Sequence, residues 1–333
     1  MTSATSEPNP AEIMKYASPR VAAVLSTYNR RGELSRCLAA LFSQSTPIHK
    51  AVVVVNGSSD DTKQMLSLDY VNESRLITVD AGRNLGNPGA LNIAIKQALS
   101  DPDTDWIWIL DDDAWPDTNA LKQLTDGGLD TLTVYAPLVL EEAGGEISFP
   151  MLTVKPRLFV RTLAELPTQN EFRVSGAWLG TMIPRNAIDR IGEVNAQLFI
   201  RGEDEDYPRR LAQAGFNFVC RRNAVLYHPK MKIVSIRFLG TGFGYEPGLA
   251  LWKSYYQFRN KVYVVRTTAR HRWLGASKGL IIGIGYLAAI FILDDHKIKR
   301  LLIWSRAMKD ALSGDLRNVA FSPDSRKSAS TSG

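Results

Sequence analysis

Four short apolar runs in the first third of the chain constrain the fold more than any other feature. They are VAAVLST (21–27), AVVVV (51–55), RLITVD (75–80) and WIWIL (106–110). Segments with helical spacing of apolar residues, such as 32–44 and 88–99, separate these runs. Strands without polar alternation are typical of parallel sheets that helices cover on both faces. The pattern therefore predicts an α/β fold with a mostly parallel central sheet flanked by helices.

Polar loops follow three of these strands. They read TYNRRG after the first strand, NGSSDDT after the second and DDDA after the fourth. In a parallel sheet the carboxyl ends of the strands share one edge, and ligands bind beyond that edge. We therefore expect the three loops to converge on one site.

Three consecutive aspartates follow the apolar run WIWIL. On an extended chain Asp111 and Asp113 point to the same side and Asp112 points away. Paired carboxylates suit Mg²⁺ or Mn²⁺ carrying a diphosphate, and a bound cation would relieve their repulsion. A solvated turn is the alternative, because Asp is common in turns. The apolar strand that delivers them favours the metal site.

The loop RNLGNPGALN (83–92) lies between the third strand and a helix that we expect to begin near Pro88. Its glycines permit close backbone approach, and the start of a helix favours an anion. It contains neither a G-x-G-x-x-G fingerprint nor a Walker A lysine, so a dinucleotide fold and a P-loop NTPase are not supported. A tight turn without a ligand is an equally good reading of this loop alone.

Four acids, Glu203 to Asp206, open a further predicted helix. The helix dipole favours acids at this end, but four in succession exceed what capping requires. One of them could act as a general base toward a hydroxyl. His228 ends a later strand in the sequence LYHP, where it could complete a metal site or bind a diphosphate, although a lone histidine is usually structural.

The C-terminal part of the chain is basic and apolar. Residues 251–309 carry twelve Lys or Arg and two acids, whereas the whole chain has a net charge of +6. Residues 279–293 are uncharged but shorter than the roughly 20 residues that cross a bilayer. They read either as a buried core helix or as a segment that contacts a membrane surface, and the basic flanks favour the membrane. No nucleic-acid-binding signature occurs, so we expect no nucleic-acid partner.

These features predict one catalytic domain over 20–250 and a helical, membrane-associated region over 251–318. We expect a flexible leader over 1–19 and a disordered tail over 319–333. The leader lacks the apolar core of a signal peptide, and two cysteines are too few for a disulfide framework. Both observations predict a cytoplasmic protein. The basic and apolar C-terminal part predicts that it is associated with the inner face of the cell membrane.

The ordered series of motifs resembles family 2 glycosyltransferases of the GT-A fold, especially bacterial galactofuranosyltransferases and their rhamnosyltransferase relatives. The series is STYNR, VVVVNGSSDDT, NLGNPGALN, WILDDDA, GAWLGTMIP, LFIRGEDEDYPRR, YHP and YYQFRNKVY, over roughly residues 20–265. The resemblance implies transfer of a sugar from a nucleotide donor to a glycan or lipid-linked glycan acceptor, with inversion and with Mn²⁺ or Mg²⁺ as cofactor. Galactofuranose from UDP-galactofuranose is the preferred donor, and dTDP-rhamnose is the alternative.

The resemblance also implies roles for individual residues. Asp111, Asp113 and His228 would hold the metal, and Asp204 would be the catalytic base, with Glu203 as the alternate one residue earlier. The implied donor-binding residues are Thr27, Asn56, Arg83, Asn84, Asp111, Asp112, Trp178, Leu179, Arg259 and Asn260. Many relatives have Asp at the position of Asn56, where it contacts uracil, so the identity of the nucleotide is less secure here.

Two other functions fit parts of the pattern. A nucleotidyltransferase also uses carboxylates and Mg²⁺, but it would bring a lysine in a glycine-rich loop near the first strand. A membrane-bound nucleotide-sugar-binding protein would use the basic end without needing the acids and His228 together. Neither explains the whole series of motifs.

Overall fold

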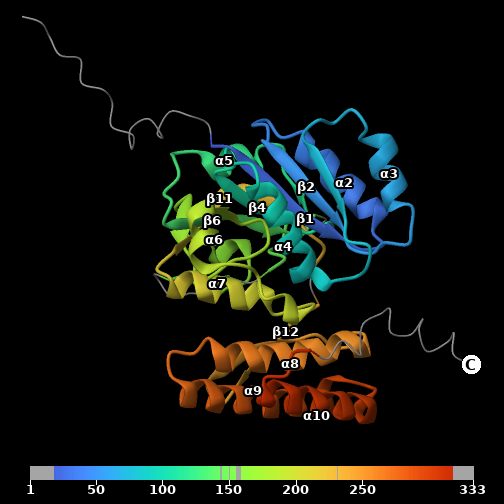
Figure 1. The fold of residues 1–333 in the computed structure, drawn as a ribbon. Helices are drawn as coiled ribbons and strands as arrows, with labels where there is room; N and C mark the ends of the chain where they lie inside the picture. The colour runs from blue at the N-terminus through green and yellow to red at the C-terminus, as the bar shows by residue number, and fades with distance from the viewer. Residues whose placement is uncertain (1–18, 143–144, 150, 155–158, 231, 318–333) are drawn as a thin grey trace, which may run out of the picture.

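The computed structural model describes residues 19–142, 145–149, 151–154, 159–230 and 232–317. The predicted tail, and the predicted leader apart from its last residue, lie outside the described residues. Within the described part, nine strands form one mixed sheet in the order β3-β2-β1-β4-β10-β6-β11-β5, with β9 paired to β11 (Figure 1).

The strands of this sheet are short and mostly buried. Their bounds are β1 Val21–Thr27, β2 Lys50–Val55, β3 Leu76–Asp80, β4 Trp106–Ile109, β5 Trp115–Pro116, β6 Thr133–Leu140, β9 Glu171–Arg173, β10 Met182–Pro184 and β11 Asn217–Tyr227. β3, β2, β1 and β4 are parallel, as are β6 and β11, whereas β10 is antiparallel to both of its neighbours. Because β10 runs opposite to both β4 and β6, the strands β4, β6 and β11 all run in the same direction. β4 and β11 therefore end at the same edge of the sheet.

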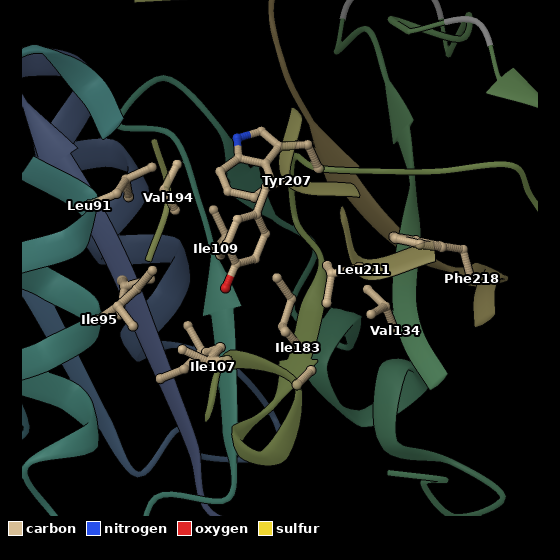
Figure 2. Close-up of a cluster of buried hydrophobic side chains, with 14 of the residues drawn as sticks. Leu91, Ile95, Ile107, Ile109, Val134, Ile183, Val194, Tyr207, Leu211 and Phe218 are labelled. Atoms are coloured by element: carbon tan, nitrogen blue, oxygen red, sulfur yellow. The ribbon is translucent and has the colours of Figure 1, made fainter. Parts of the chain in front are cut away.

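Helices cover both faces of the sheet, as predicted. They are α2 Arg31–Phe42, α3 Thr62–Asp69, α4 Gly86–Leu99, α5 Ala120–Thr125, α6 Arg185–Ile191 and α7 Glu203–Gln213, with short 3₁₀ turns at Leu163–Glu165 (η1) and Ala196–Leu198 (η2). α2, α3 and α5 pack on one face, and α4, α6 and α7 pack on the other. Figure 2 shows Leu91 and Ile95 of α4 near Ile107 and Ile109 of β4 in the second of these cores.

The elements outside the main sheet and its flanking helices are two hairpins and three C-terminal helices. Two hairpins, β7–β8 (Met151–Leu152 and Phe159–Val160) and β12–β13 (Val234–Phe238 and Thr241–Tyr245), lie outside the main sheet. α8 Leu251–Thr267, α9 Arg272–Leu293 and α10 Lys297–Ser313 lie side by side next to α7 (Figure 1) and share an aromatic core with β13. Long side chains of α8 reach across to the segment before α7, so the helices and the sheet form one packed unit.

Three segments are organised in a way that their local sequence pattern does not show. The segments 216–220 and 224–229 each have the apolar pattern of a strand, but most of their residues lie in the single strand β11, whose register shifts between Arg221 and Val225. Only the last three residues of GAWLGTMIP are a strand, because Gly180 turns the chain with a positive φ. The apolar run 279–293 belongs to a longer helix, α9, which by length and composition alone could cross a membrane.

Candidate active site

The three aspartates lie in the turn that follows β4, at the carboxyl edge of the sheet. Asp111, Asp113 and His228 each offer one ligand atom, and these atoms all lie within 4.8 Å of one another. His228 follows β11. Because β11 and β4 run in the same direction, His228 lies at the edge of the sheet where β4 ends. The predicted metal ligands are therefore together, although a turn rather than an extended strand aligns the two aspartates.

The ring of His228 is oriented by the backbone. Its Nδ1 lies 2.6 Å from the carbonyl oxygen of Pro229, and its Nε2 lies 3.4 Å from Oδ1 of Asp113. Nδ1 donates its proton to that carbonyl, so Nε2 is the nitrogen that faces the carboxylate of Asp113. Histidines that bind metals are held in this way by a partner on their other nitrogen.

The carboxylates of the turn have different proton affinities. Burial raises the pKa of Asp111 to about 7, and the neighbouring Asp113 adds to the rise. Burial acts in the same direction on Asp113, but the hydrogen bond with His228 and the charge of Arg30 outweigh it and bring its pKa to about 2. Burial also raises the pKa of Asp112 to about 6, against the opposing effect of Arg30. Burial thus acts on all three carboxyls, and it leaves two of them with a raised pKa that a nearby cation would lower.

Arg30, which follows β1, contacts this turn directly. Its Nη1 donates to Oδ1 of Asp112 at 3.1 Å and to Oδ2 of Asp113 at 2.5 Å. Asp112 also lines the adjoining cavity, so one nitrogen of Arg30 connects the cavity wall to Asp113.

A cavity of about 390 Å³ opens beside the acidic turn. Its walls come from the loops after β1, β2 and β3, from the acidic turn, from the segment before α7 and from the first turn of α8. The lining residues are Ser26, Tyr28, Asn29, Arg30, Asn56, Asn84, Gly86, Asn87, Asp112, Phe199, Ile200, Trp252 and Lys253. The predicted convergence of the strand-end loops is thus found in the structure.

Asn56 fixes the loop that forms one wall of this cavity. Its Oδ1 accepts from the backbone N–H of Leu85 at 2.8 Å, and its Nδ2 donates to the carbonyl of Gly86 at 3.2 Å. A carboxylate could not make the second hydrogen bond, which gives a physical reason for an amide at this position. Gly86 has a φ of 75°, and a Cβ there would lie 2.1 Å from the carbonyl oxygen of Phe199, so only glycine fits.

Asn87 joins the cavity to the acidic helix. It accepts from the Ser26 hydroxyl at 2.5 Å and donates through Nδ2 to Oε1 of Glu203 at 3.0 Å. The sequence analysis did not single out Asn87, because nothing in a loop motif shows that a residue 116 positions away lies against it.

The two candidate bases at the start of α7 lie in different surroundings. Glu203 is buried, and its Oε2 has no hydrogen-bond partner among the described residues. Burial, with the adjacent Asp204, raises the pKa of Glu203 to about 7. Asp204 is exposed and accepts from the backbone N–H of Gly202 at 2.9 Å; the surrounding protein and the nearby Glu205 raise its pKa as well.

Arg259 and Asn260, which the resemblance implies as donor-binding residues, are not among the residues that line the cavity. Both side chains are buried within α8 and donate to backbone carbonyls. Arg259 donates to Gln197 and Leu198 at 3.1 and 3.2 Å, and Asn260 donates to Leu198, Ile200 and Arg201 at 2.9, 3.0 and 2.6 Å. They hold the segment that leads into α7, which has positive φ angles at Phe199 and Arg201.

Five other predicted donor residues do not line the cavity, and one of them, Asp111, belongs to the metal-ligand cluster instead. Thr27 is buried beside Asp112, and Arg83 is exposed on the loop after β3. Trp178 packs edge-on against Tyr207 with ring centroids 5.6 Å apart, and Leu179 packs against the opposite core. The residues that line the cavity from the C-terminal part are instead Trp252 and Lys253, for which the sequence offers only a general excess of basic residues.

The sheet, the acids at its carboxyl edge and the adjoining cavity belong to a fold of the GT-A type. Residues 22–179 match the family described as "Glycosyl transferase family 2". This match and the relatives below identify the chain as a glycosyltransferase with a family 2 domain.

The curated relatives are galactofuranosyltransferases. GlfT1 of Mycolicibacterium smegmatis is 27% identical over 219 residues, covering 63% of this chain and 70% of that protein. GlfT1 of Mycobacterium tuberculosis is 27% identical over 259 residues, covering 74% and 82%. Among solved structures, S. aureus TarS 1–349 in complex with UDP-GlcNAc has a TM-score of 0.57 at 13% identity, covering 93% of this chain and 92% of that one; this chain covers 44% of a longer TarS chain. The likeness to TarS concerns the fold.

Proposed function

We propose that this glycosyltransferase moves galactofuranose from UDP-galactofuranose to a hydroxyl of a glycan or lipid-linked glycan, with inversion and with a divalent metal. The observation that carries the proposal is the convergence of Asp111, Asp113 and His228 at the rim of the donor cavity, next to the acidic start of α7. The similarity to GlfT1 supports the choice of sugar.

The residues at the acidic turn fit a hard divalent cation. Asp111 and Asp113 supply carboxylate oxygens and His228 supplies an imidazole nitrogen, a ligand set that suits Mn²⁺ and that also accommodates Mg²⁺. When bound, the metal supplies charge that stabilises the departing diphosphate. The chain's own Arg30 adds a fixed positive charge on the same side.

Asp204 is the proposed base, with Glu203 as the alternate. An acceptor must reach the base from solvent, and Asp204 is exposed whereas Glu203 is buried. In a single displacement, the acceptor oxygen attacks the anomeric carbon while its proton passes to Asp204. The bond from that carbon to the diphosphate oxygen breaks, and the nucleoside diphosphate leaves with the electron pair.

The C-terminal helices supply a surface for a membrane. α9 and α10 expose large apolar side chains, namely Trp273, Leu280, Ile284, Phe291, Ile292, Ile298 and Leu302. Basic residues of the same helices, including Lys278, Lys297 and Lys299, are also exposed. An apolar face with a basic border binds the interface of an anionic bilayer. We therefore propose a catalytic domain over 20–250 and a membrane-associated region over 251–318, at the cytoplasmic face of the membrane.

The donor is tested by a thermal-shift panel of UDP and dTDP sugars, with and without Mn²⁺. Metal-dependent stabilisation by UDP-galactofuranose above UDP-galactopyranose is expected, followed by release of UDP when an acceptor glycan is added. A preference for dTDP-rhamnose would instead make the enzyme a rhamnosyltransferase. Release of pyrophosphate would indicate a nucleotidyltransferase.

Membrane contact is tested with point variants rather than by deleting 266–333, because that deletion would expose the buried face of α8. Leu280→Ser with Ile284→Ser should weaken binding to anionic vesicles, and the exposed Leu68→Ser on α3 is the matched control. Equal vesicle binding by both variants would refute the surface.

A further inference from the structure

The first turn of α8 contributes two side chains to the donor cavity. Trp252 and Lys253 line it together with Arg30 and Asp112. These two residues lie more than seventy positions beyond the end of the family 2 match at residue 179. The part of the chain that matches the family therefore builds only part of this cavity.

Three cations approach one another at this wall. Burial lowers the pKa of Lys253, and the charges of Arg201 and Arg30 lower it further. Arg30 is paired with Asp112 and Asp113, and Arg201 is paired with Glu246 at 2.5 Å. Lys253 makes no ion pair or hydrogen bond with any residue in the part of the chain that the structure describes, although Asp113 and Glu246 are close enough to act on its charge.

Lys253 also cannot turn away freely. Its ammonium lies 5.4 Å from the ring centre of Trp252, and the side chain is half-buried. A partly desolvated ammonium that is repelled by the charges of two nearby arginines is costly unless an anion is present. The cavity and the metal ligands share one rim, so the anion that arrives there is the diphosphate of the nucleotide donor.

We propose that Lys253 binds the diphosphate of the nucleotide-sugar donor, so that the C-terminal helices complete the donor site. This inference rests on the proposed function of the site. An ammonium ion suits a phosphate oxygen as a compact point charge. The contact holds the donor before transfer and the nucleoside diphosphate after it.

The test compares Lys253→Met with Lys253→Arg and with Lys309→Met. Met keeps most of the packing of the lysine stem on Trp252, Arg restores the charge, and Lys309 is an exposed residue of α10 whose loss changes the net charge equally. UDP and dTDP are titrated by calorimetry in the presence of Mn²⁺, and uridine is titrated by ligand-observed nuclear magnetic resonance.

We expect Lys253→Met to weaken binding of the diphosphate by about 10- to 100-fold and to leave uridine binding unchanged. Lys253→Arg should recover most of the loss, and Lys309→Met should bind like the wild type. Equal diphosphate binding by Lys253→Met and the wild type would overturn the inference alone. Equal losses for uridine and UDP would also overturn it, because the effect would then be on packing. A wild type that binds neither diphosphate would overturn the proposed function as well.

Discussion

The sheet edge and the C-terminal helices build the same cavity in different ways. At the sheet edge, each functional side chain follows a strand, so the chain direction alone brings Asp111, Asp113 and His228 together. In the helical layer, Lys253 reaches the cavity only because buried side chains of α8 hold it against the segment 197–201. The comparison teaches that chemistry is concentrated at the sheet edge, whereas positioning comes from the helices.

Asp113→Ala should have the largest effect and tests the sheet-edge half of the comparison. Removing this carboxylate takes away a metal ligand and leaves Arg30 and His228 without a shared partner. Transfer should fall by about 10³-fold or more, and metal-dependent donor binding should be lost. Mn²⁺ binding measured by electron paramagnetic resonance checks this, with the exposed Asp126→Ala as control. Unchanged Mn²⁺ binding would remove Asp113 from the metal site.

Asp204→Asn should lower kcat by about 10²- to 10⁴-fold while donor binding persists. The base must be deprotonated to act, and the pKa of Asp204 is raised, so the wild-type rate should fall as pH drops through a value above the usual range of Asp. Initial rates across pH, with calorimetry for donor binding, measure both effects. A near-normal rate in Asp204→Asn, with loss in Glu203→Gln, would move the base to Glu203.

Asn260→Ala tests whether the C-terminal helices position the segment before α7. It leaves the carbonyls of Ile200 and Arg201 without their side-chain donor and removes one of the two donors to the carbonyl of Leu198, which should cost about 2–3 kcal/mol in the free energy of unfolding. Because the same segment leads to Asp204, kcat should also fall while metal affinity stays constant. Urea denaturation and steady-state kinetics measure the two effects, with the exposed Thr267→Ala on the same helix as control. Full stability and rate would show that α8 does not position the loop.

Glu203→Gln should have the smallest effect, which is a change in the pH dependence of the free energy of unfolding. The folded-state pKa of Glu203 is about 7 against an ordinary 4.5, so the folded protein binds more protons than the unfolded chain between these values. Stability is therefore lost as pH rises through that window. Gln does not titrate and so does not lose stability in this way. The free energy of unfolding of the variant, relative to that of the wild type, should therefore be about 1–2 kcal/mol higher at pH 8 than at pH 5. Urea denaturation in EDTA at both pH values measures it; an equal difference at both would contradict the raised pKa.

The sequence determined the class of fold and most of the metal site. Continuous apolar strands require burial on both faces, and this pattern is contained within each of the short segments 21–27, 51–55 and 106–110. The resemblance then identified His228 as the third member of the cluster. Only the tertiary structure showed how the antiparallel β10 brings β11 to the edge where β4 ends.

The surroundings of the donor and the base were decided by contacts between distant segments. The resemblance implies Arg259 and Asn260 as donor-binding residues, but both side chains are buried and donate to backbone carbonyls. Glu203 and Asp204 are neighbours in the sequence, yet Asn87 contacts only the first, and solvent reaches the second. The type and spacing of a residue indicate which bonds it could make. Its burial and its actual partners depend on packing between distant segments, which a local sequence pattern does not reveal.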